Sequence, residues 1–156
     1  KKPDMLISSS GKLAAIRGHE GQLYVSSWMQ DRFTGEVWAR REGKGKQKLP
    51  KWKDLEGMNC DEYGCYYRDL SSGTRIALSE HPASHAQDCA LADIVIANDP
   101  VNSKKCDAPV IIDWFDLWRY GSYAVWLGSE KDDGRVKILS VADRRGQRPW
   151  VHAQHR

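Results

Sequence analysis

Residues 93–100 read DIVIANDP, an unbroken apolar run of mostly β-branched side chains that stops at a turn signal. A strand with one wet face alternates between apolar and polar residues, whereas an unbroken run is typical of a strand buried on both faces. Asn98, Asp99 and Pro100 mark the end of the run. Val110–Ile112 is a second, shorter run of the same kind. We therefore expect residues 93–97 to lie centrally in a β-sheet.

The segments around this run predict further elements of a mixed sheet. Residues 65–68 and 74–78 flank Leu70–Gly73, which indicates a hairpin. Pro82 suits the first turn of a helix that extends to about Ala92. Downstream we expect a short helix at 114–118, a strand at 123–127, a turn at 131–134 and a strand at 136–141.

The N-terminal third is predicted to be rich in β-structure. Turns containing Gly and Ser separate three apolar runs, which indicates a three-stranded meander at residues 5–7, 13–16 and 23–25. Between residues 31 and 41 the spacing changes, because Phe33, Val37 and Trp38 share one face of a helix. We expect a short helix there.

These elements predict a single domain over residues 1–156, with a basic, turn-rich tail at 143–156. A chain of this length is sufficient for one core, and it contains no internal repeat or low-complexity linker. The expected class is mixed α+β (α/β), with a mixed β-sheet core and a few short helices.

Composition excludes several classes of protein. An apolar share of 40%, with seven Trp and six Tyr, excludes a largely disordered chain. A net charge of +3 supports only a weak preference for anions, below that of dedicated nucleic-acid binders. No apolar stretch approaches the length of a membrane span. The sequence begins without an initiating Met, so we expect a fragment excised from a longer protein whose targeting and membrane segments lie elsewhere.

The four cysteines fit disulfides better than a zinc or redox site. Zinc ribbons place their ligands in closely spaced pairs, whereas sixteen residues separate Cys89 from Cys106. No C-x-x-C motif occurs. Four cysteines allow three connectivities, of which we favour Cys60 with Cys65, across a turn containing Gly64, and Cys89 with Cys106. Disulfides indicate an oxidising compartment; the alternative is four reduced thiols in a cytosolic protein.

The sequence offers no metal or catalytic centre that its motifs support. His81 and His85 have the spacing of two zinc ligands on a helix, but Pro82 indicates that His81 precedes the helix. Asp113 and Asp116 are better explained as helix caps than as an acid/base pair. G-x-S-x-G and glycine-rich phosphate loops do not occur in the sequence. We predict no catalytic residue, no metal and no cofactor.

Two basic segments are candidate nucleic-acid contacts, because each combines cations with an aromatic ring that can stack on a base. The first, which we call the lysine loop, spans residues 44–53 and offers Lys44, Lys46, Lys48, Lys51, Trp52 and Lys53. The second is the tail, which offers Arg144, Arg145, Arg148 and Trp150. The alternative for each is an ordinary solvated segment, which is what charge runs usually are, and we favour that alternative.

A series of motifs resembles the C-terminal soluble region of ComEC-type competence proteins in order and approximate spacing. The motifs are CDEYGC at 60–65, DCALADIVI at 88–96, Cys106 before VIID at 110–113, DLWRYG at 116–121 with AVWL at 124–127, and RGQRPW at 145–150. PDMLI at 3–7 and LAAIR at 13–17 look like the start of that region, just after its last membrane helix. The resemblance therefore spans nearly the whole chain.

The resemblance implies a domain on the periplasmic side of the bacterial inner membrane, in a channel that passes single-stranded DNA into the cytoplasm during natural transformation. That setting allows disulfides to form. The implied partners are the transmembrane part of the same protein, single-stranded DNA and other competence proteins. In many members this domain is metallo-β-lactamase-like and is thought to degrade one strand through a His/Asp metal motif. No H-x-H-x-D-H run occurs here, so we expect a degenerate, shortened version of that fold without metal.

Three hypotheses for function follow. The leading one is a non-catalytic module of a DNA-uptake channel that guides or holds DNA or braces the channel. The second is a divergent metal-dependent nuclease that degrades the non-transported strand, with His81, His85, Asp88 and Asp93 as its nearest metal-binding residue types. The third is a structural domain that never touches nucleic acid.

Overall fold

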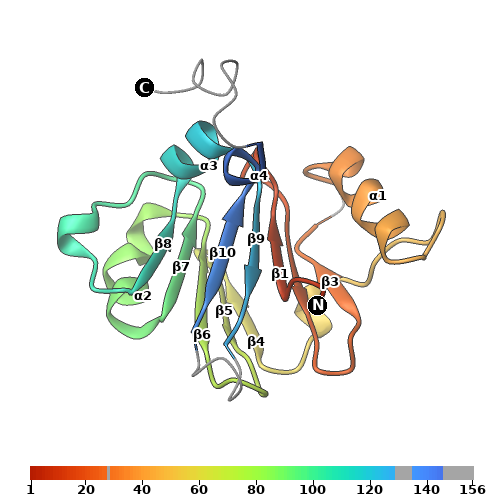
Figure 1. Cartoon of the computed structure of the whole chain (residues 1–156). Helices are drawn as coiled ribbons and strands as arrows, with labels where there is room; N and C mark the ends of the chain where they lie inside the picture. The colour runs from red at the N-terminus through yellow and green to blue at the C-terminus, as the bar shows by residue number, and fades with distance from the viewer. Residues whose placement is uncertain (28, 129–134, 146–156) are drawn as a thin grey trace.

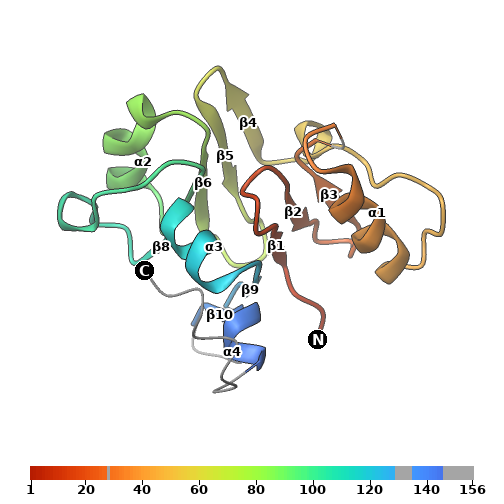
Figure 2. The same cartoon turned by 90° about the horizontal axis from the view of Figure 1, so that it is seen from above.

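The strands form two five-stranded sheets in the computed structural model, which describes residues 1–27, 29–128 and 135–145 (Figure 1). The sheets pack face to face at the centre of the molecule, with α1 (Arg32–Arg41) outside one and α2 (His85–Leu91) outside the other (Figures 1 and 2). The remaining helices are α3 (Trp114–Tyr120), α4 (Val141–Arg145) and the 3₁₀ helices η1 (Trp52–Asp54), η2 (Pro82–Ser84) and η3 (Ser103–Lys105).

The first sheet, sheet A, is antiparallel and takes its strands from both ends of the chain. Its order is β10–β9–β1–β2–β3. The strands are β1 (Met5–Ile7), β2 (Ala14–Arg17), β3 (Leu23–Val25), β9 (Tyr123–Trp126) and β10 (Lys137–Ser140). Met5 in the middle strand lies opposite Ile16 on one side and Val125 on the other. The predicted N-terminal meander is therefore confirmed, and β9 and β10 extend it.

The second sheet, sheet B, comes from one continuous part of the chain. Its order is β4–β5–β6–β7–β8, and its strands are β4 (Met58–Asp61), β5 (Gly64–Arg68), β6 (Arg75–Ser79), β7 (Ile94–Ala97) and β8 (Val110–Ile112). The pairs from β4 to β6 are antiparallel, whereas β7 pairs in parallel with both β6 and β8. Every residue of β7 is buried, which confirms the predicted central strand.

The main core lies between the two sheets. Alternate residues of each strand point inward, so Ile7 and Val125 of sheet A pack in one cluster with Ile76, Ile94 and Ile112 of sheet B. The intervening residues point outward. On sheet A they pack with α1 through Ala15, Val25 and Trp38, and on sheet B with α2 through Ala77, Val95 and Cys89. The result is a layered sandwich of helix, sheet, sheet and helix.

The structure confirms the mixed α+β class and refines several expectations. The mixed β-sheet core is divided between two sheets, one antiparallel and one mixed. Helix α1 lies where it was expected, but Phe33 is 74% exposed and does not share the buried face of Trp38. Strand β4 was not predicted. Residues 143–145 end helix α4 instead of forming turns. The predicted turn at 131–134 and the tail from residue 146 lie outside the described residues.

Candidate functional site

Both disulfides lie on sheet B or against it. Cys60 of β4 and Cys65 of β5 are direct register partners and form one bond, with their Cα atoms 4.0 Å apart. Cys89 on α2 forms the other with Cys106, which follows η3. This is the pairing that we favour from the sequence. A side chain at Gly64 would collide with the backbone of β6, so this position accepts only glycine.

The sequence's metal-binding residue types do not converge. Within residues 1–27, 29–128 and 135–145, no three His, Cys, Asp or Glu side chains are close enough to hold a metal ion. His81 Nδ1 instead accepts a hydrogen bond from the Ala83 N–H at 3.0 Å and caps η2. Asp93 Oδ1 accepts from the Arg75 guanidinium at 3.2 Å, which lowers the pKa of the carboxyl. Burial raises the pKa of Asp88 and opposes its ionisation.

Asp113 and Asp116 form a capping box at the start of α3. The Asp113 carboxylate accepts from the Asp116 N–H at 3.2 Å, and the Asp116 carboxylate accepts from the Asp113 N–H at 3.0 Å. Asp113 Oδ2 also accepts from the Val101 N–H at 2.8 Å, which ties the loop before η3 to this helix. The predicted structural role of the pair is confirmed.

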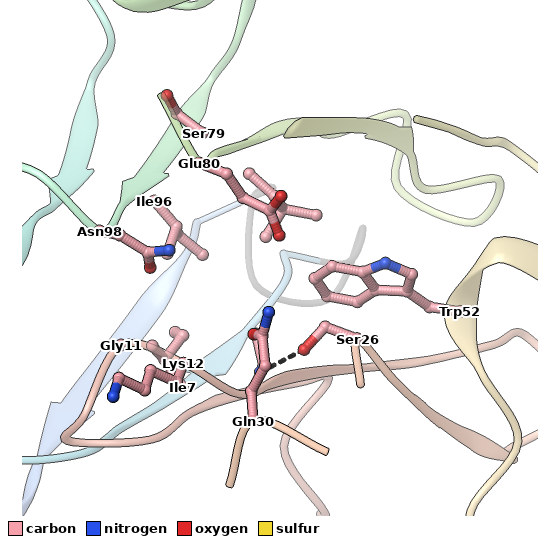
Figure 3. A pocket seen from close by; sticks show the side chains of 12 residues that line it. Ile7, Gly11, Lys12, Ser26, Gln30, Trp52, Ser79, Glu80, Ile96 and Asn98 are labelled. Carbon is pink, nitrogen blue, oxygen red and sulfur yellow. Dashed lines mark hydrogen bonds between the residues drawn. The ribbon is translucent and has the colours of Figure 1, made fainter. Parts of the chain in front are cut away.

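A polar cleft opens between the ends of the two sheets (Figure 3). The side chains of Glu80 and Gln30 point into it, and Asn98, Lys12 and Trp52 surround them. Its volume is about 30 Å³, which is enough for one or two water molecules but not for a substrate. Its rim offers amide, hydroxyl, ammonium and carboxylate groups without histidine or cysteine. This cleft is therefore too small for a reaction centre, and its lining lacks the residue types that a catalytic or metal centre most often uses.

The lysine loop is exposed at its cations but not at its aromatic ring. Lys46, Lys48, Lys51 and Lys53 are exposed and Lys44 is half-buried. Trp52, however, is only 6% exposed and packs in the core between the sheets. The expectation that its ring is available to stack on a base is therefore wrong. Trp52 begins η1, and that turn directs the indole inward. Burial of this large apolar ring stabilises the folded state.

The tail is described only in part. Arg144 is exposed near the end of α4, and Arg145 is the last residue of that helix. Arg148 and Trp150 lie outside the described residues. The structure thus places the lysine loop next to α1 and Arg144 on α4, which directly follows β10 of sheet A.

Helix α1 adds cations to the lysine loop that were not selected from the sequence. Arg32 and Arg40 of α1 line a groove of about 400 Å³ together with Lys46 and Lys48 of the loop. Glu36 is the single carboxylate in this lining, and it pairs with Arg32 at 3.2 Å. We call this surface the α1 groove. Arg40 also lies in the last turn of α1, where a basic side chain suits the helix C-terminus.

Comparisons with known proteins assign no family to the chain. No protein-family model, no curated protein and no solved structure matches it. Among the residues that the structure describes, no helix combines the length and apolarity that crossing a bilayer requires. The function is therefore inferred from the residues themselves and from their geometry.

Proposed function

We propose that this chain is a non-catalytic extracytoplasmic module of a ComEC-type DNA-uptake channel, where it guides or holds incoming DNA or braces the channel. The motifs at residues 60–65, 88–96 and 116–127 support this proposal, because they follow the family's order. The two disulfides support the periplasmic location, because such bonds form and persist in oxidising compartments. The expected partners are the transmembrane part of the same protein, single-stranded DNA and other competence proteins.

We further propose that the fold is a shortened, degenerate form of the metallo-β-lactamase-like domain found in that family. Two sheets packed face to face, with α1 and α2 on their outer sides, are compatible with it. The engagement of His81 as a cap and of Asp93 with Arg75 argues against a divergent nuclease, because neither side chain is left oriented toward a shared metal. The module is therefore proposed to contact DNA without cleaving it.

The observation that carries a role in DNA contact is the α1 groove. Four cations and one paired carboxylate give its lining a net charge of +3. The exposed lysines of the adjacent loop extend this field, so a polyanion gains favourable interactions by following the surface. The domain's overall charge of +3 is thus unevenly distributed, and one side of the molecule attracts phosphates.

Binding of a fluorescein-labelled single-stranded oligonucleotide, measured by anisotropy across a salt series, tests this function. We expect binding at low salt that weakens with added NaCl, with a slope of log K against log salt of about −0.7 per phosphate contact. Lys46→Glu with Lys48→Glu should weaken binding and flatten the slope. Lys104→Glu with Lys105→Glu makes the same change of charge on η3, outside sheet B, and should change neither quantity by much.

Two results would overturn the proposal. Absence of binding at low salt would leave only the structural role. Cleavage of plasmid DNA by purified protein carrying zinc or manganese, lost in His85→Ala, would establish the nuclease instead.

A further inference from the structure

Within the part of the chain that the structure describes, no helix fully covers the outer face of sheet A. Helix α1 packs over β2 and β3, whereas the outward side chains of β1, β9 and β10 border a groove of about 560 Å³. The apolar floor of this groove is half-buried and consists of Leu6, Ala124, Trp126 and Leu139. Figure 2 shows α1 on one side of the N-terminal segment and α4 on the other. We call this surface the sheet A groove.

The rim of the sheet A groove is strongly basic. The side chains of Lys2, Arg17, Arg41, Lys137 and Arg144 line it, with Glu42 as the one carboxylate of the lining, which leaves a net charge of five minus one, or +4. That carboxylate already has partners. Arg17 pairs with it through both guanidinium NH groups, and Lys2 lies 3.7 Å away, so their interactions lower the pKa of Glu42. Among the described residues that line this groove, no other carboxylate faces the remaining cations, Arg41, Lys137 and Arg144.

An aromatic ring and a cation stand together on the floor. Lys137 Nζ lies 5.1 Å from the centroid of the Trp126 indole, a cation–π contact between neighbouring strands. The indole N–H donates to the Lys1 carbonyl oxygen at 3.0 Å, which holds the edge of the ring toward the N-terminal segment. The half-buried indole and the Lys137 ammonium over it thus lie together on the floor of the groove. This combination is the one that single-strand binding proteins use for a base and its phosphate.

We propose that the sheet A groove binds a segment of single-stranded nucleic acid, with bases against the apolar floor and phosphates along the basic rim. This inference rests on the proposed function and adds a second contact surface to the α1 groove. Charge complementarity favours an anionic polymer over an apolar protein segment, which would leave the rim cations without partners. A duplex keeps its bases stacked and paired, so it has no base face to place on Trp126. A free anion would leave the apolar floor uncovered.

The sheet A groove and the α1 groove both border helix α1. Arg41 lines the sheet A groove, and its neighbour Arg40 lines the α1 groove. A strand that leaves the sheet A groove past the end of α1 therefore meets the cations of the lysine loop. The two surfaces make different contributions: the α1 groove offers charge alone, whereas the sheet A groove adds an aromatic floor.

The test uses a fluorescein-labelled thymidine 20-mer and two sets of groove variants, compared by anisotropy at several NaCl concentrations. Arg41→Glu with Lys137→Glu should weaken binding about tenfold or more at low salt and flatten the salt slope. Trp126→Ala should weaken binding about tenfold with an unchanged slope, because it removes stacking and not charge. Trp126→Leu keeps an apolar side chain in place but also removes the stacking surface, so it should show the same loss of affinity. It replaces Trp126→Ala in the comparison if the alanine variant is poorly folded.

The control for charge is again Lys104→Glu with Lys105→Glu, which should bind within about twofold of wild type. Suppose that wild type binds, and that the charge variant of the sheet A groove and the Trp126 variants bind equally well, whereas Lys46→Glu with Lys48→Glu binds weakly. The sheet A groove is then excluded as the binding surface, and the proposed function survives. If wild type does not bind, both fail. Equal affinity for a duplex, unaffected by Trp126→Leu, would overturn the single-strand assignment alone.

Discussion

The two outer faces of the sandwich differ in how they are covered. On sheet B, α2 packs over Val95, which is fully buried, and the Cys89–Cys106 disulfide fastens that helix to the loop beyond it. On sheet A, α1 covers only β2 and β3, and Leu6 on β1 remains half-buried beside a basic rim. One face is therefore closed by packing and a covalent bond, and the other is left available to a ligand.

The residue types on the two faces account for this difference. The outward positions of β6 and β7 include Ala77 and Val95, which are small or β-branched, and a helix can approach them closely. The outward positions of β9 and β10 include Trp126 and Lys137, whose size and charge do not suit close packing against a helix. We thus assign a stabilising role to one side of the domain and propose binding for the other.

The largest loss of folding stability should come from removing the disulfide that fastens α2 over sheet B. Cys89→Ala with Cys106→Ala removes a bond that spans 17 residues and should lower the free energy of unfolding by about 3 kcal/mol. Cys60→Ala with Cys65→Ala, which spans 5 residues, should cost about 2 kcal/mol. Urea unfolding of the two variants under oxidising conditions measures both. A larger loss in the Cys60–Cys65 variant would contradict the view that α2 depends on its disulfide.

A pair of alanine substitutions compares the packing of the two faces directly. Val95→Ala should lower the free energy of unfolding by about 2 kcal/mol, because the side chain is fully buried under α2. Leu6→Ala deletes more atoms but should cost less than about 1 kcal/mol, because its side chain faces the sheet A groove and is only half-buried. Urea unfolding at neutral pH gives both values. An equal or larger loss for Leu6→Ala would show that the open face is packed after all.

A further, small effect concerns the ion pair that joins α1 to sheet A. The Arg17 guanidinium holds the pKa of Glu42 below its usual value of 4.5, so the folded state favours the carboxylate. That stability is present above about pH 4.5 and is lost as pH falls through the lower, folded-state pKa. Glu42→Gln should therefore cost about 1 kcal/mol at pH 7.

The difference between wild type and Glu42→Gln should shrink in acid. Unfolding curves for the two proteins between pH 7 and pH 3 measure this difference directly, and other carboxylates contribute equally to both. Glu36→Gln is the matched control, since its partner Arg32 is an exposed neighbour on the same helix and the pair is worth little. A constant difference at all pH values would show that Glu42 is not ionised against Arg17.

Local patterns in the sequence predicted most elements but not how the sheets divide. The unbroken run at residues 94–97 and the meander at 5–25 are encoded by neighbouring residues, and both are confirmed. Strand β4 was missed because three of its four residues, Asn59, Cys60 and Asp61, are exposed and give no apolar pattern. Such exposure is typical of an edge strand. The pairing of β1 with β9 joins residues about 120 positions apart, and no local pattern records it.

The candidate sites show the same limit. The four cysteines were visible, and proximity favoured the pairing that the structure contains. Trp52 was misjudged, because its lysine neighbours indicate solvent while η1 turns its ring into the core. The sheet A groove was not foreseen at all, since Lys2, Arg41 and Lys137 come together only when β1 enters the middle of sheet A. Surfaces built from distant segments require the topology first.

The central position of β1 also constrains the order in which the chain acquires structure. Sheet B lies within residues 58–112, so all its strands are present once that stretch has been synthesised. β1 can pair with β2 early, but its other edge has no partner until residues 123–126 arrive. During that interval the unpaired edge of β1 can associate with the same edge of another chain. We therefore expect this domain to complete its folding late and to depend on low concentration, or on assistance, while its last strands emerge.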